Sequence, residues 1–307
     1  MVKMKSFGDT GPKLYLCSTP IGNLDDVTPR LLETLASAEL LAAEDTRQTR
    51  KLLSRYQIHA KRLISFHEHN SNHRLPILVS AWENGDSVAL VTDAGTPCVS
   101  DPGQSAVRAA IQMGVPVIPI PGASAVLSAL VVSGLTSERF AFHGFLSRDK
   151  KNARRELAAY QHYQGSLVIY EAPHRLQTTL QLVKEMFPNC PMAVCKELTK
   201  QHETVWRGSV EEIESEISSE EIRGEFVLVL DLAEYALSST VMDTEKESLD
   251  KQMAEESPLE YALDEVNVAM AEGQSMRDAV REVAKRLAVS RSQLYQLALK
   301  QLSQGDS

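Results

Sequence analysis

Short apolar segments alternate with helical segments along the first 125 residues, and this alternation limits the fold more than any other feature. Each apolar segment ends in a polar or glycine-rich stretch, as in "KLYLCSTPIGN", "ELLAAED", "RLISFHEHN", "SVALVTDAG" and "VPVIPIPGAS". Between them, apolar residues recur at helical spacing, with Thr28 placed to cap a helix and Pro29 in its first turn. Strands that alternate with helices in this way predict a parallel α/β sheet.

The ends of these predicted strands carry the polar groups of the region. They are "TPIGN", "AEDTR", "HEHN", "TDAGTP" and "PGASA". In open parallel sheets, ligands bind at the carboxyl ends of the strands, and glycines there allow the backbone to come close to a ligand. None of the loops has the spacing of a dinucleotide-binding, phosphate-binding or serine-hydrolase motif. We expect a site for a nucleoside or an amino-acid ligand at this edge; tight turns that only reverse the chain are the alternative.

Four further strands are predicted, in "FAFHGFL", "SLVIYEAP", "MAVCKELT" and "GEFVLVLDL". They indicate a second α/β domain over residues 128–234, which follows a first domain over residues 13–127. Residues 235–258 lack periodic apolar positions and predict an acidic linker. Three phenylalanines alternate along the first of these four strands and are expected to pack in the core: Phe140, Phe142 and Phe145.

Residues 259–307 return to helical periodicity. Two helices are predicted around a short turn at "LAVSRS", and Ser290 is placed to cap the second of them. Their apolar face consists of Ala279, Val283, Ala284, Leu287, Val289, Leu294 and Leu297. The arrangement resembles a helix-turn-helix, whose second helix contacts nucleic acid; a plain pair of packed helices is the alternative.

The net charge of −9 conceals an uneven distribution of charge. Residues 234–265 carry ten acidic and two basic side chains, whereas residues 275–302 carry six basic and two acidic ones. The basic C-terminal segment therefore keeps nucleic acid among the possible partners. Residues 1–12 resemble a flexible leader without a secretory signal, no apolar run is long enough to span a membrane, and the four cysteines have no metal-binding spacing. We expect a cytoplasmic protein with free thiols.

Ten stretches of the chain occur in the order in which the tetrapyrrole methylase superfamily has them. They are "LYLCSTPIGNLDDVTPRLLETL", "AAEDTRQTRKLL", "HEHN", "VALVTDAGTPCVSDPG", "PIPGASAVLSAL", "SGL", "RFAFHGFL", "YEAPHRL", "KELTKQHE" and "GEFVLVL", within residues 14–232. The chain most resembles the RNA-modifying branch of that superfamily. The resemblance implies two α/β domains of the tetrapyrrole methylase type, with S-adenosyl-L-methionine in the cleft between them, followed by the small helical module.

The resemblance also implies an activity and partners. Members of the RNA-modifying branch methylate the ribose 2′-OH of a cytidine in the decoding region of 16S ribosomal RNA. The implied partners are this RNA or the assembled 30S subunit, without a membrane, and the implied oligomer is a homodimer.

Several residues match the cofactor loops of the family one by one. "DAGTPCVSDPG" occupies the place of the Gly-x-Pro loop, and "PGASA" that of the second loop. The resemblance assigns cofactor binding to Ile21, Gly95, Thr96, Pro97, Val99, Ser124, Ala125, Tyr170, Glu171 and Leu198. Tetrapyrrole-modifying members often have aspartate at the position of Thr96, so this difference argues against a porphyrinoid substrate.

Polar and basic residues near the strand ends are candidates for the substrate side. In "AEDTRQTRK", Asp45 is a candidate to orient the 2′-OH or to accept its proton, and Arg47 is a candidate to bind a phosphate. The candidates for RNA contacts are Arg50, Lys51, His67, Asn70, Lys150, Lys151, Arg154 and Arg155. Helix caps with a solvated basic face are the alternative. The histidines of "HEHNSNH" have no accompanying metal-ligand motif, and no metal is expected.

Two other functions remain open from the sequence. One is methylation of a tetrapyrrole or another small molecule, which needs a closed apolar pocket. The other is a helix-turn-helix regulator whose α/β part senses a ligand without turning it over. Because an RNA methyltransferase needs an open basic rim, "AEDTR" and the basic run at residues 148–155 favour the RNA substrate.

Overall fold

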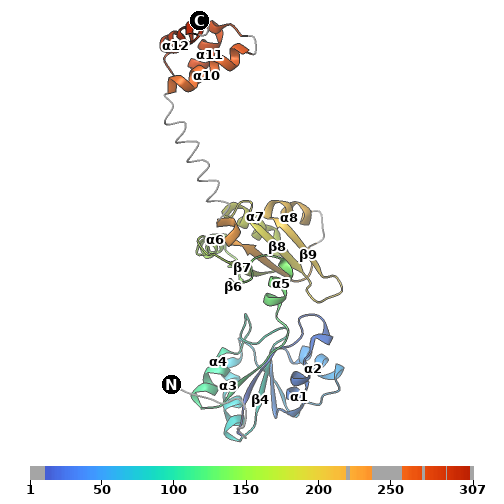
Figure 1. The fold of residues 1–307 in the computed structure, drawn as a ribbon. Helices are drawn as coiled ribbons and strands as arrows, with labels where there is room; N and C mark the ends of the chain where they lie inside the picture. Colours follow the sequence, from blue (N-terminus) through green and yellow to red (C-terminus); the bar gives the residue numbers. More distant parts are fainter. Residues whose placement is uncertain (1–10, 219–221, 237–257, 272–273, 288, 305–307) are drawn as a thin grey trace. The chain divides into compact units, whose positions relative to one another are not determined.

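The structure is a computed structural model that describes residues 11–218, 222–236, 258–271, 274–287 and 289–304. The chain divides into two compact units, Met1–Tyr235 and Ala236–Ser307, which are described separately (Figure 1). Most of the expected leader and most of the expected acidic linker lie outside the described residues.

A parallel five-stranded sheet forms the first half of the larger unit, as the alternation of strands and helices predicted. Its strands are β1 (Leu14–Cys17), β2 (Leu40–Ala43), β3 (Leu63–Ser65), β4 (Val88–Val91) and β5 (Val117–Ile120). They lie in the order β3-β2-β4-β1-β5. The intervening helices are α1 (Pro29–Ser37), α2 (Thr46–Arg55), α3 (Ser71–Glu83) and α4 (Gln104–Gln112), with a 3-10 turn, η1 (Leu24–Asp26), after β1.

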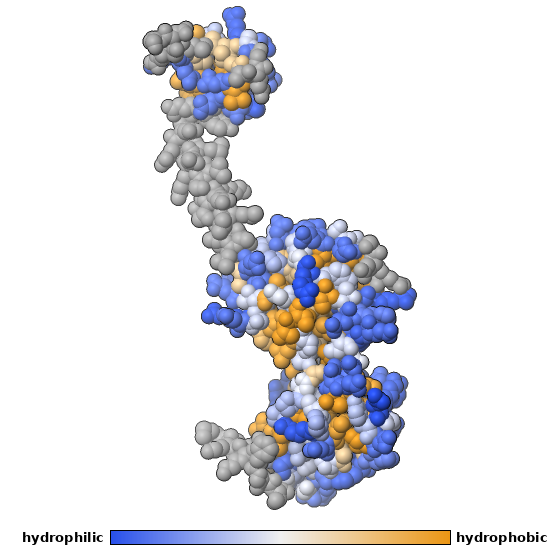
Figure 2. Space-filling model, turned by 45° about the vertical axis from the view of Figure 1, so that its right-hand side comes forward, coloured by the Kyte–Doolittle hydropathy of each residue, from blue (hydrophilic) through white to orange (hydrophobic). Residues whose placement is uncertain are grey.

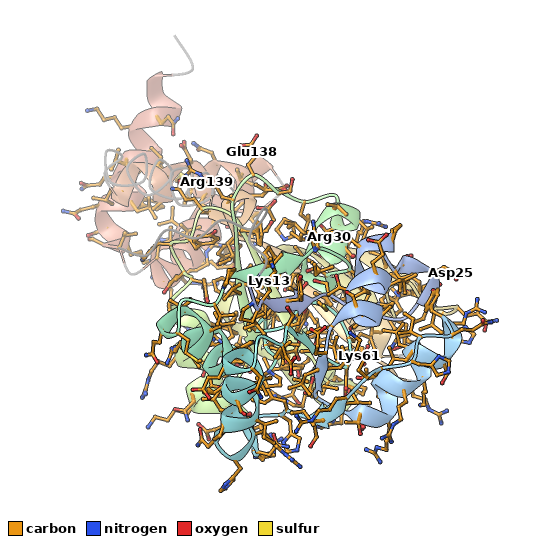
Figure 3. All side chains as sticks on the ribbon, turned by 90° about the horizontal axis from the view of Figure 1, so that it is seen from below. Lys13, Asp25, Arg30, Lys61, Glu138 and Arg139 are labelled. Carbon is orange, nitrogen blue, oxygen red and sulfur yellow. The ribbon has the colours of Figure 1, made fainter. Side chains whose placement is uncertain are left out.

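Helices cover both faces of this sheet. Helices α1 and α2 lie on one face and α3 and α4 on the other (Figure 1). One layer of buried side chains joins each pair of helices to the sheet. Thr28 caps α1 by accepting a hydrogen bond from the Leu31 amide (3.2 Å), and Pro29 begins the helix, as predicted. The labelled side chain of Arg30 then ties α1 to the sheet, because it donates to the carbonyl of Pro119 in β5 (Figure 3).

The second sheet is mixed and has the strand order β6-β7-β10-β8-β9. Its strands are β6 (Phe140–Phe145), β7 (Ser166–Glu171), β8 (Pro191–Lys196), β9 (Thr204–Ser209) and β10 (Phe226–Asp231). Only β6 and β7 pair in parallel; the other neighbours are antiparallel. The edge strand β9 was not predicted, because its sequence "TVWRGS" does not form an apolar run. Around the sheet lie α5 (Ala125–Ser133), α6 (Lys150–Ala158), η2 (Pro173–Arg175), α7 (Leu176–Met186) and α8 (Val210–Ile217).

The strands of the second sheet place alternate side chains on opposite faces. Leu167 and Ile169 of β7 pack in the layer formed by α6, α7 and α8, whereas Val168 packs against α5. Since α5 covers the second sheet, the expected domain boundary at 127/128 falls inside this helix. The chain passes from the first sheet to the second at residues 121–124, ahead of α5.

The smaller unit contains α10 (Pro258–Ala271), α11 (Met276–Arg286) and α12 (Arg291–Gln304). The apolar face predicted from the sequence belongs to the shared core of these three helices. Ser290 directly precedes α12, as predicted, and Ser275 caps α11 by accepting a hydrogen bond from the Asp278 amide (3.3 Å). A helix, a short turn and a second helix are therefore present, with α10 packed against both.

Candidate functional site

Three loops meet at the carboxyl edge of the first sheet because β4, β1 and β5 are neighbours. The Thr19 amide donates to the Gly95 carbonyl (2.9 Å), and the Gly95 amide donates to the Thr19 carbonyl (3.0 Å). The Thr96 hydroxyl lies 3.0 Å from that of Ser18 and donates to the Ala123 carbonyl (3.3 Å). These bonds join the ends of the three strands into one surface.

Gly95 has a positive φ of 76°, a conformation that residues with a side chain rarely adopt. The sequence suggested that its backbone groups would face a ligand. The structure differs, since the bridge to Thr19 uses both the N–H and the C=O of Gly95. The glycine is needed for the left-handed turn, and a Cβ built there would be in ordinary contact with Ile21 Cγ2 at 3.5 Å.

A cavity of about 350 Å³ lies between these loops and the second sheet. Nine of the ten residues that the sequence assigned to cofactor binding line it: Ile21, Gly95, Thr96, Val99, Ser124, Ala125, Tyr170, Glu171 and Leu198. Pro97 is buried but is not part of the lining. The residues assigned from the sequence therefore do surround one cavity. They come from distant loops, since Ile21 and Leu198 are 177 positions apart in the chain.

The sequence missed a second group of lining residues: Ala94, Ser100, Asp101, Phe145, Ala172, Pro173, Cys195, Gly224, Glu225, Phe226 and Val227. Phe226 and Val227 lie at the start of β10, which is antiparallel to its neighbours, so a rule based on the carboxyl ends of strands cannot find them. The motif "GEFVLVL", which contains both residues, was the sequence signal that could have identified them.

Phe145 corrects a further expectation. It was expected to pack in the core, but its side chain is 55% exposed and lines the cavity, and Phe140 is 40% exposed. The reason is that β6 is an edge strand with a register shift between Phe142 and Gly144, which disturbs the alternation of faces. Only Phe142 packs inward, where its ring meets the Tyr170 ring edge-on at a centroid distance of 4.8 Å.

Glu171 is held by groups within the protein. Its carboxylate accepts hydrogen bonds from the Ala172 amide (2.8 Å) and the Thr179 hydroxyl (2.5 Å), and it lies 3.4 Å from Nε of Arg175. The side chain is fully buried. Burial also raises the pKa of the neighbouring Tyr170 to about 12, so the phenol stays neutral. Both residues shape the wall of the cavity.

A second cavity, of about 530 Å³, opens beside the first. The ends of β2 and β3 contribute Glu44 and His67–His69 to it, and the loop before α4 contributes Ser100–Gly103. This position follows from the strand order, since β3, β2 and β4 are consecutive neighbours. Of the predicted RNA contacts, His67 lines this cavity, whereas Asn70 supports it: Asn70 Oδ1 accepts a hydrogen bond from the His67 amide (2.9 Å).

Asp45 and Arg47 are engaged with each other. Asp45 caps α2 by accepting a hydrogen bond from the Arg47 amide (2.8 Å), and the two side chains form an ion pair at 2.6 Å. The hydrogen bonds from Arg47 lower the pKa of Asp45 to about 2. Such a carboxylate is a weak proton acceptor, and Asp45 lines neither cavity. The expected proton-accepting role of Asp45 is therefore not supported, and the helix cap considered as the alternative is what the structure contains.

Some basic side chains of helix α6 form ion pairs, and others do not. Lys150 lies 3.1 Å from Glu185 of α7, and Arg154 forms an ion pair with the same carboxylate. Lys151 and Arg155 are exposed, and neither has an ion pair within the described part of the chain. Arg50 and Lys51 are likewise exposed, on α2. Only part of the predicted RNA-binding charge is thus available to a polyanion.

The described residues contain no group of three or more histidine, cysteine or acidic side chains arranged to hold a metal ion. In the same residues, no helix combines the length and apolar character that crossing a membrane requires.

Comparisons with known proteins agree with this geometry. Residues 13–214 match the family model described as Tetrapyrrole (Corrin/Porphyrin) Methylases. A Synechocystis sp. relative named ribosomal RNA small subunit methyltransferase I is 40% identical over 287 residues, covering 93% of this chain and 97% of its own. A relative of the same name from Bacillus subtilis is 38% identical, covering 92% of each chain.

Solved structures share the fold at low sequence identity. Uroporphyrin-III C-methyltransferase from Thermus thermophilus, complexed with S-adenosyl homocysteine, is 17% identical with a TM-score of 0.52, covering 72% of this chain and 99% of that one. Diphthine synthase is 15% identical with a TM-score of 0.56, covering 71% and 89%.

Proposed function

The chain belongs to the tetrapyrrole methylase family, and we propose that it transfers a methyl group from S-adenosyl-L-methionine to the ribose 2′-OH of a cytidine in 16S ribosomal RNA. The observation that carries this proposal is the similarity to ribosomal RNA small subunit methyltransferase I over almost the whole chain, including the cavity-lining loops. The substrate is small-subunit RNA, either free or in the 30S subunit.

The larger unit offers a cavity that fits S-adenosyl-L-methionine. Its volume of about 350 Å³ is that of a small-molecule site. Ile21, Leu198 and Val227 give an apolar surface suited to a purine ring. The remaining wall includes Glu225, whose carboxylate forms an ion pair with Lys200 (2.9 Å). We assign cofactor binding to the nine lining residues predicted from the sequence.

When bound, S-adenosyl-L-methionine supplies a methyl group that is already activated by the positively charged sulfur. The contribution expected from the protein is therefore mainly orientation and the removal of one proton. The linked loops around Thr19, Gly95 and Thr96 hold the wall of the cavity in one arrangement. The buried Glu171 and its partner Arg175 fix the opposite wall, because Arg175 also donates to the carbonyls of Leu146 (2.8 Å) and Ser147 (3.1 Å).

The RNA backbone is expected to lie along the exposed basic side chains. Arg50 and Lys51 of α2 and Lys151 and Arg155 of α6 are available for phosphates, and RNA affinity depends strongly on such contacts. The helical module adds exposed Arg277, Lys285 and Arg291. We place the reaction in the cytoplasm, where ribosomal subunits are found.

A homodimer is part of the proposal. Leu127 and Val131 of α5 are 53% and 73% exposed, which is unusual for large apolar side chains on one helix. Exposed hydrophobic surface is visible on both α/β domains (Figure 2). We expect this exposed apolar surface to be buried against a second copy of the chain. Sedimentation of the purified chain measures the oligomeric state directly.

One transfer assay separates the three functions considered from the sequence. Tritiated S-adenosyl-L-methionine is incubated with undermethylated small subunits, with a mixture of porphyrinoids, or with DNA. Label in the subunit RNA alone supports the proposal. Label in the porphyrinoids would indicate a small-molecule methyltransferase, and cofactor binding without transfer would indicate a ligand-sensing regulator.

Neutralising the unpaired basic residues of α6 is expected to weaken RNA binding several-fold. Lys151→Gln with Arg155→Gln removes two charges available to phosphates, so the salt dependence of binding should fall by about one unit of slope or more. The measurement is a titration of labelled small-subunit RNA at several salt concentrations.

The control pair is Lys150→Gln with Arg154→Gln, which changes the net charge by the same amount on the same helix. Because Glu185 already pairs with both side chains, this variant should retain more of the parent slope. Equal losses in the two variants would mean that only overall charge matters, and no loss in either would remove α6 from the RNA surface.

A further inference from the structure

Two residues, Ser100 and Asp101, line both cavities of the larger unit. Asp101 is therefore the one carboxylate among the described lining residues that borders both spaces. We propose that the second cavity receives the target nucleoside and that Asp101 accepts the proton of its 2′-hydroxyl. This inference rests on the proposed function, and it assigns the proton-accepting role to a residue that the sequence reasoning did not select.

The loop that carries Asp101 is tightly fixed. Cys98 and Ser100 have positive φ angles of 69° and 61°, and Gly103 has a φ of 138°. A Cβ at Gly103 would lie 2.7 Å from Leu90 Cδ2 and 2.8 Å from Cys98 Sγ, so the loop packs directly on β4. Strained backbone of this kind persists where the surrounding structure holds it, and it is common at functional sites. The loop therefore holds Asp101 at the border between the two cavities.

The Asp101 carboxylate is not engaged by the protein. Within the described part of the chain it has neither a hydrogen bond nor an ion pair. Asp45, the proton acceptor considered from the sequence, and Glu171 of the first cavity are each bonded to an arginine and a backbone amide. A proton acceptor needs a free oxygen, and of these three acids Asp101 alone has one.

The charges that face Asp101 are acidic. Glu44 approaches from the end of β2 and Asp93 from the end of β4, while Cys98 lies in the same loop and Tyr170 on the opposite wall. Burial, followed by the repulsion of Glu44 and Asp93, raises the pKa of Asp101 to about 7. A carboxylate with this pKa is a much stronger base than one at its ordinary value, and it is still ionised in a large fraction of molecules at neutral pH.

The lining of the second cavity suits the uncharged part of a nucleotide. Glu44, Glu68 and Asp101 disfavour a phosphate by charge repulsion, but their oxygens accept hydrogen bonds from ribose hydroxyls and from an exocyclic amine. The unpaired basic side chains of α2 and α6 remain for the flanking phosphates. A nucleoside extruded from its stack, with the backbone left outside, fits this distribution of charge.

The chemical step is balanced without a further reactant. The 2′-oxygen forms a bond to the methyl carbon while the carbon–sulfur bond breaks and its electron pair stays on sulfur. The hydroxyl proton passes to a carboxylate oxygen of Asp101, which becomes a neutral acid. Asp101 then releases this proton to water through the open second cavity.

Kinetics of subunit methylation test the role of Asp101. Asp101→Asn should lower kcat by about a hundredfold or more, the usual contribution of a general base, and should leave the calorimetric affinity for S-adenosyl-L-methionine within threefold of the parent. In the parent, kcat/KM should fall tenfold per pH unit below about 7, because it reports the free enzyme and the protonated acid cannot accept a proton. Glu44→Gln should move this midpoint to lower pH, and Asp101→Glu should restore part of the activity lost in the asparagine variant.

A readout that needs no substrate accompanies the kinetics. In protein with 13C-labelled aspartate carboxyls, one resonance should titrate near pH 7, be absent in Asp101→Asn and shift to lower pH in Glu44→Gln. The folded protein binds this proton more tightly than the unfolded chain, whose aspartate titrates near 3.8. Ionisation of Asp101 therefore destabilises the folded protein progressively between pH 3.8 and about 7, and in full above 7. Asp101→Asn should have a higher melting temperature than the parent at pH 8 but not at pH 3.

The outcomes are distinguishable. An active parent whose asparagine variant keeps kcat within threefold, or whose Asp101 resonance titrates near 4, would overturn the role of Asp101 and leave the proposed function intact. A parent that binds S-adenosyl-L-methionine but transfers nothing to small subunits would overturn the proposed function, and this inference with it.

Discussion

Replacing Gly95 with valine is expected to lower the affinity for S-adenosyl-L-methionine by at least about tenfold. At its φ of 76°, the added side chain would begin 3.5 Å from Ile21 Cγ2 and fill space between two residues that line the cofactor cavity. A β-branched residue also strains this backbone conformation, which would disturb the bridge between Gly95 and Thr19. Isothermal titration calorimetry with the folded variant measures the effect.

Gly114→Val is the matched control for this prediction. Gly114 has a φ of 74°, no atom within 4 Å of a Cβ built there, and no place in the cavity lining. The two variants therefore share the backbone strain but not the position. Cofactor affinity should be preserved in Gly114→Val, and an equal loss in both variants would show that strain alone is responsible.

Removal of residues 236–307 is expected to leave cofactor binding unchanged and to lower kcat/KM for small subunits by about tenfold or more. Contacts divide the chain at Tyr235, so the first unit keeps both sheets and every residue that lines the two cavities. The lost unit carries a helix-turn-helix-like arrangement with exposed basic side chains. Since tethering raises the effective concentration of RNA near the catalytic unit, the deficit should shrink as the subunit concentration rises.

A full-length variant shows whether subunit methylation depends on the positive charge of the helical module or only on its presence. Arg277, Lys285 and Arg291 are exposed and have no ion pair in the described part of the chain. Reversing all three to glutamate should reproduce most of the truncation's deficit, because RNA binding depends on phosphate contacts. Methylation curves equal to those of the parent in both proteins would exclude the module from RNA binding. A truncated protein that no longer binds cofactor would mean that the catalytic unit extends beyond residue 235.

The sequence was sufficient for the first sheet and for nine of the twenty residues that line the cofactor cavity. Apolar runs of fixed length and helical periodicity determine which residues form strands and helices, and the family resemblance selected the loops that contain Ile21, Gly95 and Ser124. The edge strand β9 was not predicted, because polar and apolar residues alternate only weakly in its sequence. Phe226 was not predicted as a cavity-lining residue, because it lies at the amino end of an antiparallel strand.

Side-chain partners account for the remaining differences. Spacing alone could not show that Arg47 would neutralise Asp45, or that Glu185, more than thirty positions after Lys150, would pair with the basic run of α6. The strand order β3-β2-β4 likewise decides that Glu44 and Asp93 face Asp101. A local motif contains none of this information, since each contact depends on elements that are distant along the chain.

The most direct test of the central claim is the position of the transferred methyl group. Undermethylated small subunits are incubated with the purified protein and labelled S-adenosyl-L-methionine, and the extracted RNA is hydrolysed in alkali. A 2′-O-methyl group removes the hydroxyl that alkaline cleavage requires, so the account predicts label in an alkali-resistant dinucleotide whose 5′ residue is cytidine. Label recovered only in mononucleotides would place the methyl group on a base, and it would contradict both the proposed reaction and the role of a 2′-hydroxyl proton acceptor.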